Sequence, residues 1–182
     1  MEPIIYHHIK LKPLNLQELK WLLNGRDYLE KKLNLNAIPF DLSAGPEFMQ
    51  EFDMALKEYL IPQVQQNEAQ FEWFTHWLII DTNIHVAIGG IGINGLPDEH
   101  GEVMLGYFVN VRYEGNSYAT MATQILCDWI FKNNQVKAVI SDTLHDGFAS
   151  QAVLKKCGFQ IKNKTVEVTR WELKNPNSDS IV

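Results

Sequence analysis

A short polar turn between an apolar segment and an amphipathic segment is the part of this sequence best suited to chemistry. The turn carries Arg112, Gly115 and Ser117, in the spacing Arg-x-x-Gly-x-Ser. It follows an apolar run at 103–109 and precedes a helical pattern that begins near Tyr118. A strand, a tight turn and a helix start present backbone N–H groups that have no partner within the helix, so these groups can donate to an anion. We therefore expect a phosphate-bearing ligand at this turn.

The residues of the turn favour close contact with such an anion. Gly115 has no Cβ, so it can adopt a positive φ and let the main chain pass close to phosphate oxygens. The start of the following helix adds a favourable field for negative charge, about 0.3–1 kcal/mol for each such contact. The Arg112 guanidinium can add a charge-assisted hydrogen bond.

The segments around the turn predict a mixed sheet in the second half of the chain. Three strands joined by turn-rich loops favour an antiparallel meander. The helix that begins near Tyr118 has apolar residues at i, i+3, i+4 and i+7, and it crosses over to a buried strand. That strand should therefore run parallel to the strand before the turn. The expected strands are 73–81, 85–93, 102–109, 136–143, 160–164 and 166–173, and a second helix is expected at 148–156.

The first half of the chain predicts one strand and three helices. The strand, 4–11, is closed by Pro13. Asn15 and Glu18 have the spacing of a capping box, and Gly25 should end the helix that they begin. The remaining expected elements are a helix at 27–33, a loop at 39–46, a third helix that Pro46 begins and Pro62 ends, and an exposed, polar connection at 63–70.

The composition describes a globular chain of 182 residues with a formal net charge of −6. Without a long Lys/Arg block, this balance argues against a general nucleic-acid binder. We expect one domain at 1–174 and a polar, frayed tail at 175–182. Cys127 and Cys157 lie in no metal or redox motif, which favours free thiols in a reducing compartment. No signal-peptide pattern and no apolar run near the roughly 20 residues of a membrane span are visible, so we expect a cytoplasmic protein without a membrane partner.

Four pieces of the sequence, in order, resemble the motifs of the GNAT superfamily of acyl-CoA N-acyltransferases, most closely the branch of the ribosomal-protein alanine acetyltransferases. The resemblance covers most of the chain and is strongest from residue 79 to residue 159. The third piece corresponds to the pyrophosphate loop of the family. The pieces are Ile88-Gly89-Gly90-Ile91, Leu105-Gly106-Tyr107-Phe108-Val109, the segment 112–120 and the segment 149–159.

The resemblance implies an α/β (α+β) fold of GNAT type. Its central sheet should be mixed and mostly antiparallel, flanked by helices, with one parallel pair of strands splayed at the coenzyme A site. The resemblance also implies acetyl-CoA as cosubstrate, no metal, and backbone pairing of the strand end with the pantetheine amides. The implied CoA-binding residues are Phe108, Val109, Arg112, Tyr113, Glu114, Gly115, Asn116, Ser117, Tyr118 and Ala119.

Four positions depart from the family pattern. Ser117 stands where the loop usually has its second glycine or alanine, so we expect altered rather than lost affinity. Gly147 replaces an asparagine that would bond to the pantetheine arm or a neighbouring loop. Leu154 stands where many members place a tyrosine that protonates the leaving thiolate, and Met104 stands where this branch often has a glutamate.

Three residues are candidates for catalytic roles. The resemblance implies that Ser150 donates a proton or a hydrogen bond to the departing thiolate, although a serine there can also simply cap its helix. His145 lies just past the carboxyl end of a strand, where ligands gather in parallel α/β arrangements, and is a candidate base. Glu102, with His100 beside it, begins the motif strand and is another candidate base. His7 and His8 should face opposite sides of a strand, and no metal-ligand spacing is found.

The resemblance predicts direct transfer of an acetyl group from acetyl-CoA to a primary amine. A lysine-like amine with a pKa near 10.4 is neutral in about 1 part in 2,500 at pH 7, which adds roughly 4.6 kcal/mol to the barrier, whereas an α-amine adds only about 1 kcal/mol. A weak base therefore favours an α-amine. The acceptor can be a small-molecule amine or a protein N-terminus, and the protein a monomer or a homodimer. The alternatives are a non-catalytic CoA-binding regulatory module and a degenerate GNAT fold used for protein interaction.

Overall fold

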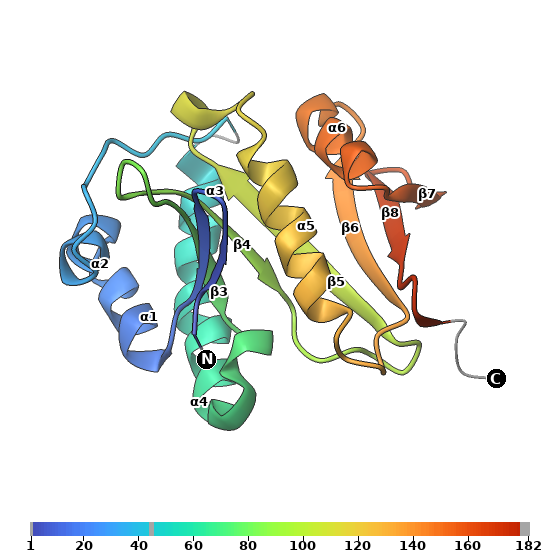
Figure 1. The fold of residues 1–182 in the computed structure, drawn as a ribbon, viewed down its shortest axis with the longest axis horizontal. Helices are drawn as coiled ribbons and strands as arrows, with labels where there is room; N and C mark the ends of the chain where they lie inside the picture. Colours follow the sequence, from blue (N-terminus) through green and yellow to red (C-terminus); the bar gives the residue numbers. More distant parts are fainter. Residues whose placement is uncertain (1, 44–45, 179–182) are drawn as a thin grey trace.

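The computed structural model describes residues 2–43 and 46–178, and its central element is an eight-stranded sheet (Figure 1). The strand order is β1-β2-β3-β4-β5-β6-β8-β7. Neighbouring strands are antiparallel except β5 and β6, which are parallel. The predicted fold class is confirmed. The strands are β1 (Ile4–Tyr6), β2 (Ile9–Pro13), β3 (His76–Asp81), β4 (Val86–Ile93), β5 (Glu102–Val109), β6 (Ala138–Leu144), β7 (Gln160–Lys164) and β8 (Val168–Lys174).

Helices cover both faces of this sheet (Figure 1). Side chains of successive strand residues point to opposite faces, so Trp77 and Ile79 join the core beneath α5 and α6, while Leu78 and Ile80 join the core beneath α1 to α4. The α-helices are α1 (Leu16–Leu23), α2 (Arg26–Lys32), α3 (Pro46–Ala55), α4 (Ile61–Gln66), α5 (Tyr118–Ile130) and α6 (Phe148–Lys156). In the described ranges no helix is both long enough and apolar enough to cross a bilayer.

The capping box predicted for α1 is present. The Glu18 N–H donates to the Asn15 side chain at 3.0 Å, and the Asn15 N–H donates to the Glu18 carboxylate at 3.0 Å. Gly25, expected to end this helix, lies just past its last residue, with φ of 116°, and α2 begins immediately after it.

The N-terminal strand is divided into a hairpin, which corrects the single strand expected at 4–11. β1 pairs with β2 from Tyr6 opposite Ile9 outward, so His7 and His8 form the turn between the strands. His7 has a positive φ of 53°. The expectation that the two histidines face opposite sides of one strand was therefore wrong.

The third helix does not end at Pro62, and the connection expected at 63–70 is mostly helical, although most of its side chains are exposed as expected. α3 continues through a π-helical turn, η1 (Leu56–Leu60), into α4. The Ile61 N–H reaches back to the Leu56 carbonyl, so the hydrogen-bond pattern changes just before the proline. Pro62 then lies in the first turn of α4, where proline is tolerated. Val64, which is 1% exposed, is the residue of this segment that packs in the core beneath the sheet, with Leu78 and Ile80.

Two further boundaries differ from expectation. Residues 68–73 form a 3-10 helix, η2 (Glu68–Trp73), so β3 begins at His76 rather than at Trp73. Asn175, which was expected in the frayed tail, is 5% exposed and donates to the Val136 carbonyl at 2.7 Å. Residues 179–182 of that tail lie outside the described residues.

The parallel strands β5 and β6 are paired over only part of their length. Their register joins Glu102 with Ala138, Val103 with Val139 and Met104 with Ile140. Beyond these pairs β6 stays bonded to β8 as far as Leu144, while β5 stays bonded to β4 as far as Val109. The two halves of the sheet therefore separate at this point, as predicted.

Candidate active site

A cavity of about 540 Å³ lies where β5 and β6 separate. Its walls come from the end of β5, the turn that precedes α5, the end of β6 and the first half of α6. Eight of the ten implied CoA-binding residues line it, and Ser150 lines it as well. The lining includes Tyr107, Phe108, Val109, Tyr113, Glu114, Gly115, Ser117, Tyr118, Ala119, Thr120, Asp142, Thr143, Leu144, Gly147 and Ser150.

The turn before α5 has the conformation expected of an anion-binding loop. Gly115 and Ser117 both have left-handed backbone, with φ of 77° and 64°. The first bond of the helix runs from the Met121 N–H to the Ser117 carbonyl at 2.9 Å, so the N–H groups of residues 118–120 precede the intrahelical ladder. These N–H groups lie at the cavity wall, where they can donate to a phosphate.

Side-chain hydrogen bonds hold the turn in this shape. Asn110 is fully buried, accepts from the Arg112 N–H at 3.1 Å and donates to the Pro39 carbonyl at 2.9 Å. Asn116 donates to the Tyr113 and Glu114 carbonyls at 3.2 and 3.1 Å. Asn116 and Arg112 are exposed and do not line the cavity, so Asn116 acts within the turn. No local pattern in the sequence indicates the bond between Asn110 and Pro39, which are 71 residues apart in the chain.

Asp81 fixes the first residue of α5. The Tyr118 hydroxyl donates to its carboxylate at 2.5 Å, and Asp81 is 4% exposed. Burial, together with this carboxylate, raises the pKa of Tyr118 to about 12. Tyr118 is therefore a neutral hydrogen-bond donor, and its bond ties the start of the helix to the end of β3. No local pattern in the sequence indicates this pairing.

Aromatic rings form the wall on the α3 side of the sheet. The Phe108 ring lies 5.4 Å from that of Phe48 and 5.5 Å from that of Phe52, and it stacks on His76 at 5.5 Å. Gly90 makes this stack possible, because a Cβ there would overlap the His76 ring. Burial lowers the pKa of His76 to about 3, so His76 is neutral and packs as an aromatic ring.

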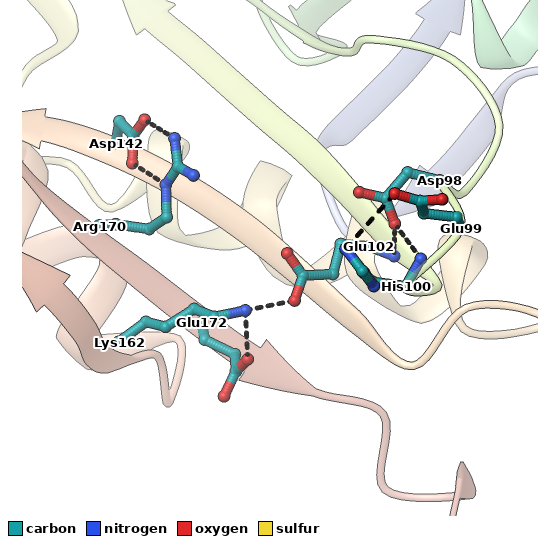
Figure 2. A network of polar contacts seen from close by, with 8 residues as sticks. All are labelled: Asp98, Glu99, His100, Glu102, Asp142, Lys162, Arg170 and Glu172. Atoms are coloured by element: carbon teal, nitrogen blue, oxygen red, sulfur yellow. Dashed lines mark hydrogen bonds and ion pairs between the residues drawn. The ribbon is translucent and has the colours of Figure 1, made fainter.

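The structure does not bring Glu102 to the cavity. Glu102 begins β5, and its carboxylate pairs with Lys162, which also contacts Glu172 at 3.1 Å (Figure 2). His100 is a turn residue beside it with 72% of its side chain exposed. A role as base at Glu102 therefore has no support from its position.

His145 also lies outside the cavity lining. Its Nδ1 is 3.1 Å from the Thr169 hydroxyl and its Nε2 is 3.1 Å from the Thr165 carbonyl. Both ring nitrogens are thus engaged by the β7–β8 hairpin, which favours a structural role for this histidine.

Asp142 is a cavity residue that the sequence analysis did not single out. Arg170 donates to both oxygens of its carboxylate, at 2.9 and 2.7 Å (Figure 2). This bidentate pair balances the charge of Asp142, which reaches the cavity lining from β6. Leu154, the position of the family's usual tyrosine, is fully buried. Among the described residues no group of three or more His, Cys, Asp and Glu is arranged to hold a metal.

The sheet is mostly antiparallel, and its one parallel pair separates beside the start of α5, as the resemblance to the GNAT superfamily predicts. The chain matches the family model of the acetyltransferase (GNAT) domain over residues 29–160. It therefore belongs to the GNAT acetyltransferase family, whose members use acetyl-CoA.

Known proteins with similar sequence or structure agree with this assignment. The chain is 31% identical over 98 residues to the uncharacterized N-acetyltransferase YjdG of Bacillus subtilis (strain 168), across 54% of this chain and 58% of that protein. The structure of a ribosomal L7/L12 α-N-protein acetyltransferase, RimL, in complex with coenzyme A matches with a TM-score of 0.68 at 15% identity, covering 98% of this chain and 100% of that one. A ribosomal-protein-S5-alanine acetyltransferase from Vibrio fischeri matches with a TM-score of 0.66 at 14% identity, over 98% and 100% of the two chains. At these identities the structural matches show a shared fold.

Proposed function

We propose that this protein transfers the acetyl group of acetyl-CoA directly to a primary amine. One observation carries the proposal: the strands β5 and β6 separate over a turn whose left-handed Gly115 and Ser117 present free helix-start N–H groups to a cavity. The turn would hold the pyrophosphate. The unpaired edge of β5 at Phe108 and Val109 would bond the pantetheine amides as an added strand does.

In the proposed reaction the neutral amine attacks the thioester carbonyl between the separated strands. A C–N bond forms and the C–S bond breaks, with backbone N–H groups of β5 stabilising the oxyanion. The ammonium proton leaves through water, since the described cavity lining contains no histidine and its Asp142 is already paired with Arg170. The other carboxylate of the lining, Glu114, belongs to the turn that would hold the pyrophosphate. The Ser150 hydroxyl, or water, donates to the departing thiolate.

The acceptor that best fits this site is an α-amine. Without a dedicated base, an amine with a pKa near 7.8 pays about 1 kcal/mol to be neutral at pH 7, against roughly 4.6 kcal/mol for a lysine-like amine. Two proteins that share the fold are named as α-N-protein and ribosomal-protein-alanine acetyltransferases. A protein N-terminus or a small α-amine is therefore the acceptor class that we propose.

Calorimetry and thiol release test the proposal together. We expect acetyl-CoA to bind, and CoA thiol to appear when peptides with a free N-terminus are added. A matched panel of N-terminally blocked peptides that carry lysine should release thiol at least tenfold more slowly. Absence of acetyl-CoA binding at millimolar concentration would refute the proposal, and binding without thiol release from any amine would favour a regulatory CoA-binding module.

A further inference from the structure

The Tyr107 hydroxyl bridges the two halves of the separated sheet. Pairing of β5 with β6 ends at Met104, and Tyr107 lies three residues farther along β5, roughly 10 Å on. From there its hydroxyl donates to the backbone carbonyl of Ser150 at 3.0 Å. The bond thus connects β5 with the first turn of α6 across the gap, where the two strands themselves make no ladder bonds.

The hydrogen bond from Tyr107 ends at Ser150, the residue that the proposed reaction places beside the sulfur of CoA. Tyr107 and Ser150 both line the cavity. Gly147, the residue just before α6, gives no side-chain cap to this helix. The Gln151 side chain ties the start of α6 to the Leu144 and His145 carbonyls at 3.0 Å each, on the β6 side of the gap. The Tyr107 bond supplies the support from β5, and it acts on the main chain of Ser150, so the serine hydroxyl stays free for a ligand.

We infer that Tyr107 is a positioning residue that holds the Ser150 hydroxyl at the thiol end of CoA. The inference rests on the proposed function, because it takes the gap between β5 and β6 as the path of the pantetheine arm. Tyr107 does not supply the proton itself. Burial raises the pKa of its phenol above the ordinary value, and its proton is already directed to the Ser150 carbonyl.

A comparison of Tyr107→Phe, Ser150→Ala and the double variant tests this inference. Phenylalanine keeps the buried ring and removes only the hydroxyl, and Ser150→Ala keeps the carbonyl that accepts the bond. The probes are CoA and desulfo-CoA, which lacks the sulfur, and calorimetry gives the two Kd values for each protein. Tyr6→Phe is the control, because Tyr6 is 54% exposed on β1.

We expect wild type to prefer CoA over desulfo-CoA and Tyr107→Phe to reduce that preference about three- to tenfold, the usual worth of one hydrogen bond. The Kd for desulfo-CoA should stay within about twofold. Ser150→Ala should reduce the preference similarly, and the double variant should match Ser150→Ala, because Tyr107 acts through the serine. Amide hydrogen exchange in the unliganded protein should quicken over residues 147–152 in Tyr107→Phe but not in Tyr6→Phe.

Other results would overturn the inference. If Tyr107→Phe weakened the binding of CoA and of desulfo-CoA equally, the Tyr107 bond would affect only the width of the cavity and not the position of the Ser150 hydroxyl. If the losses of CoA preference in the two single variants multiplied in the double variant, Tyr107 would contact the ligand itself. If wild type bound both probes equally, Ser150 would have no role at the sulfur, although acetyl-CoA binding would be unaffected. Failure of wild type to bind CoA would refute the proposed function and this inference with it.

Discussion

Gly115 and Ser117, on either side of Asn116, are the two left-handed residues of the turn before α5, and each reaches that conformation differently. Gly115 adopts φ of 77° at no steric cost, whereas Ser117 holds φ of 64° with a Cβ, at a cost of about 1 kcal/mol. The serine therefore weakens the turn slightly relative to a glycine but keeps its N–H groups in place.

Replacement of Gly115 by alanine should destabilise the protein by about 1 kcal/mol and weaken acetyl-CoA binding. The added Cβ would meet no atom within 4 Å, so the loss would come from backbone strain. Denaturant unfolding and calorimetry measure the two effects. Gly106→Ala is the matched control for stability, because its Cβ is also free of contacts and its φ is not positive. Equal unfolding free energies for both variants would contradict the prediction.

His76 should make the fold sensitive to acid. Its folded pKa of about 3 lies below the ordinary 6.5, because burial disfavours the charged ring. The unfolded chain therefore takes up a proton first, and stability falls as the pH drops from 6.5 towards 3. Between pH 7 and pH 5 the expected loss is about 2 kcal/mol.

Urea unfolding of His76→Phe at the two pH values checks this prediction. Phenylalanine can stack on Phe108 but cannot titrate, so the variant should lose less stability than wild type between pH 7 and pH 5. His100→Gln, changed at an exposed histidine, should keep the wild-type dependence. An unchanged dependence in His76→Phe would assign the acid sensitivity to other groups.

The turn before α5 and the segment around Pro39 are elements that depend on each other through Asn110. Replacement of Asn110 by alanine removes the two hydrogen bonds of a buried side chain and should cost about 2 kcal/mol of unfolding free energy. Acetyl-CoA affinity should fall as well, since the loop must then be ordered by the ligand.

Asn36→Ala is the control for that change, because Asn36 is an exposed asparagine with one side-chain bond, to the Ile84 carbonyl. It should cost well under half as much and leave the Kd for acetyl-CoA unchanged. A Kd for Asn110→Ala equal to that of wild type would show that the turn keeps its shape without the asparagine.

For the molecule as a whole, acetyl-CoA should stabilise the folded state. Binding at a concentration 100 times Kd adds about 2.7 kcal/mol, which should raise the Tm of a chain of this size by roughly 5–10 °C. A thermal scan with acetyl-CoA, and one with free acetate as control, measures the shift. The absence of a shift at saturating cosubstrate would speak against a site that exists in the folded state.

The sequence predicted those features that depend on neighbours in the chain. The capping box at Asn15, the positive φ of Gly115 and the parallel crossover through α5 follow from local rules of spacing and backbone freedom. It did not predict the partners of Asp81 and Tyr107, which lie 37 and 43 residues away. Such pairs depend on how the sheet and helices come together, as does the continuation of the helix past Pro62.

The π-helical turn η1 sets the rotation of α3 about its own axis relative to α4. If the same five residues adopted ordinary α geometry at unchanged chain length, α3 would turn by roughly 100° about its axis relative to α4. Phe48 and Phe52, whose rings face Phe108 at 5.4 and 5.5 Å, would then swing away from the β-strand edge. The extra residue that this π-helical turn accommodates thus decides which way the aromatic wall of the cavity faces, although no residue of that wall belongs to the turn.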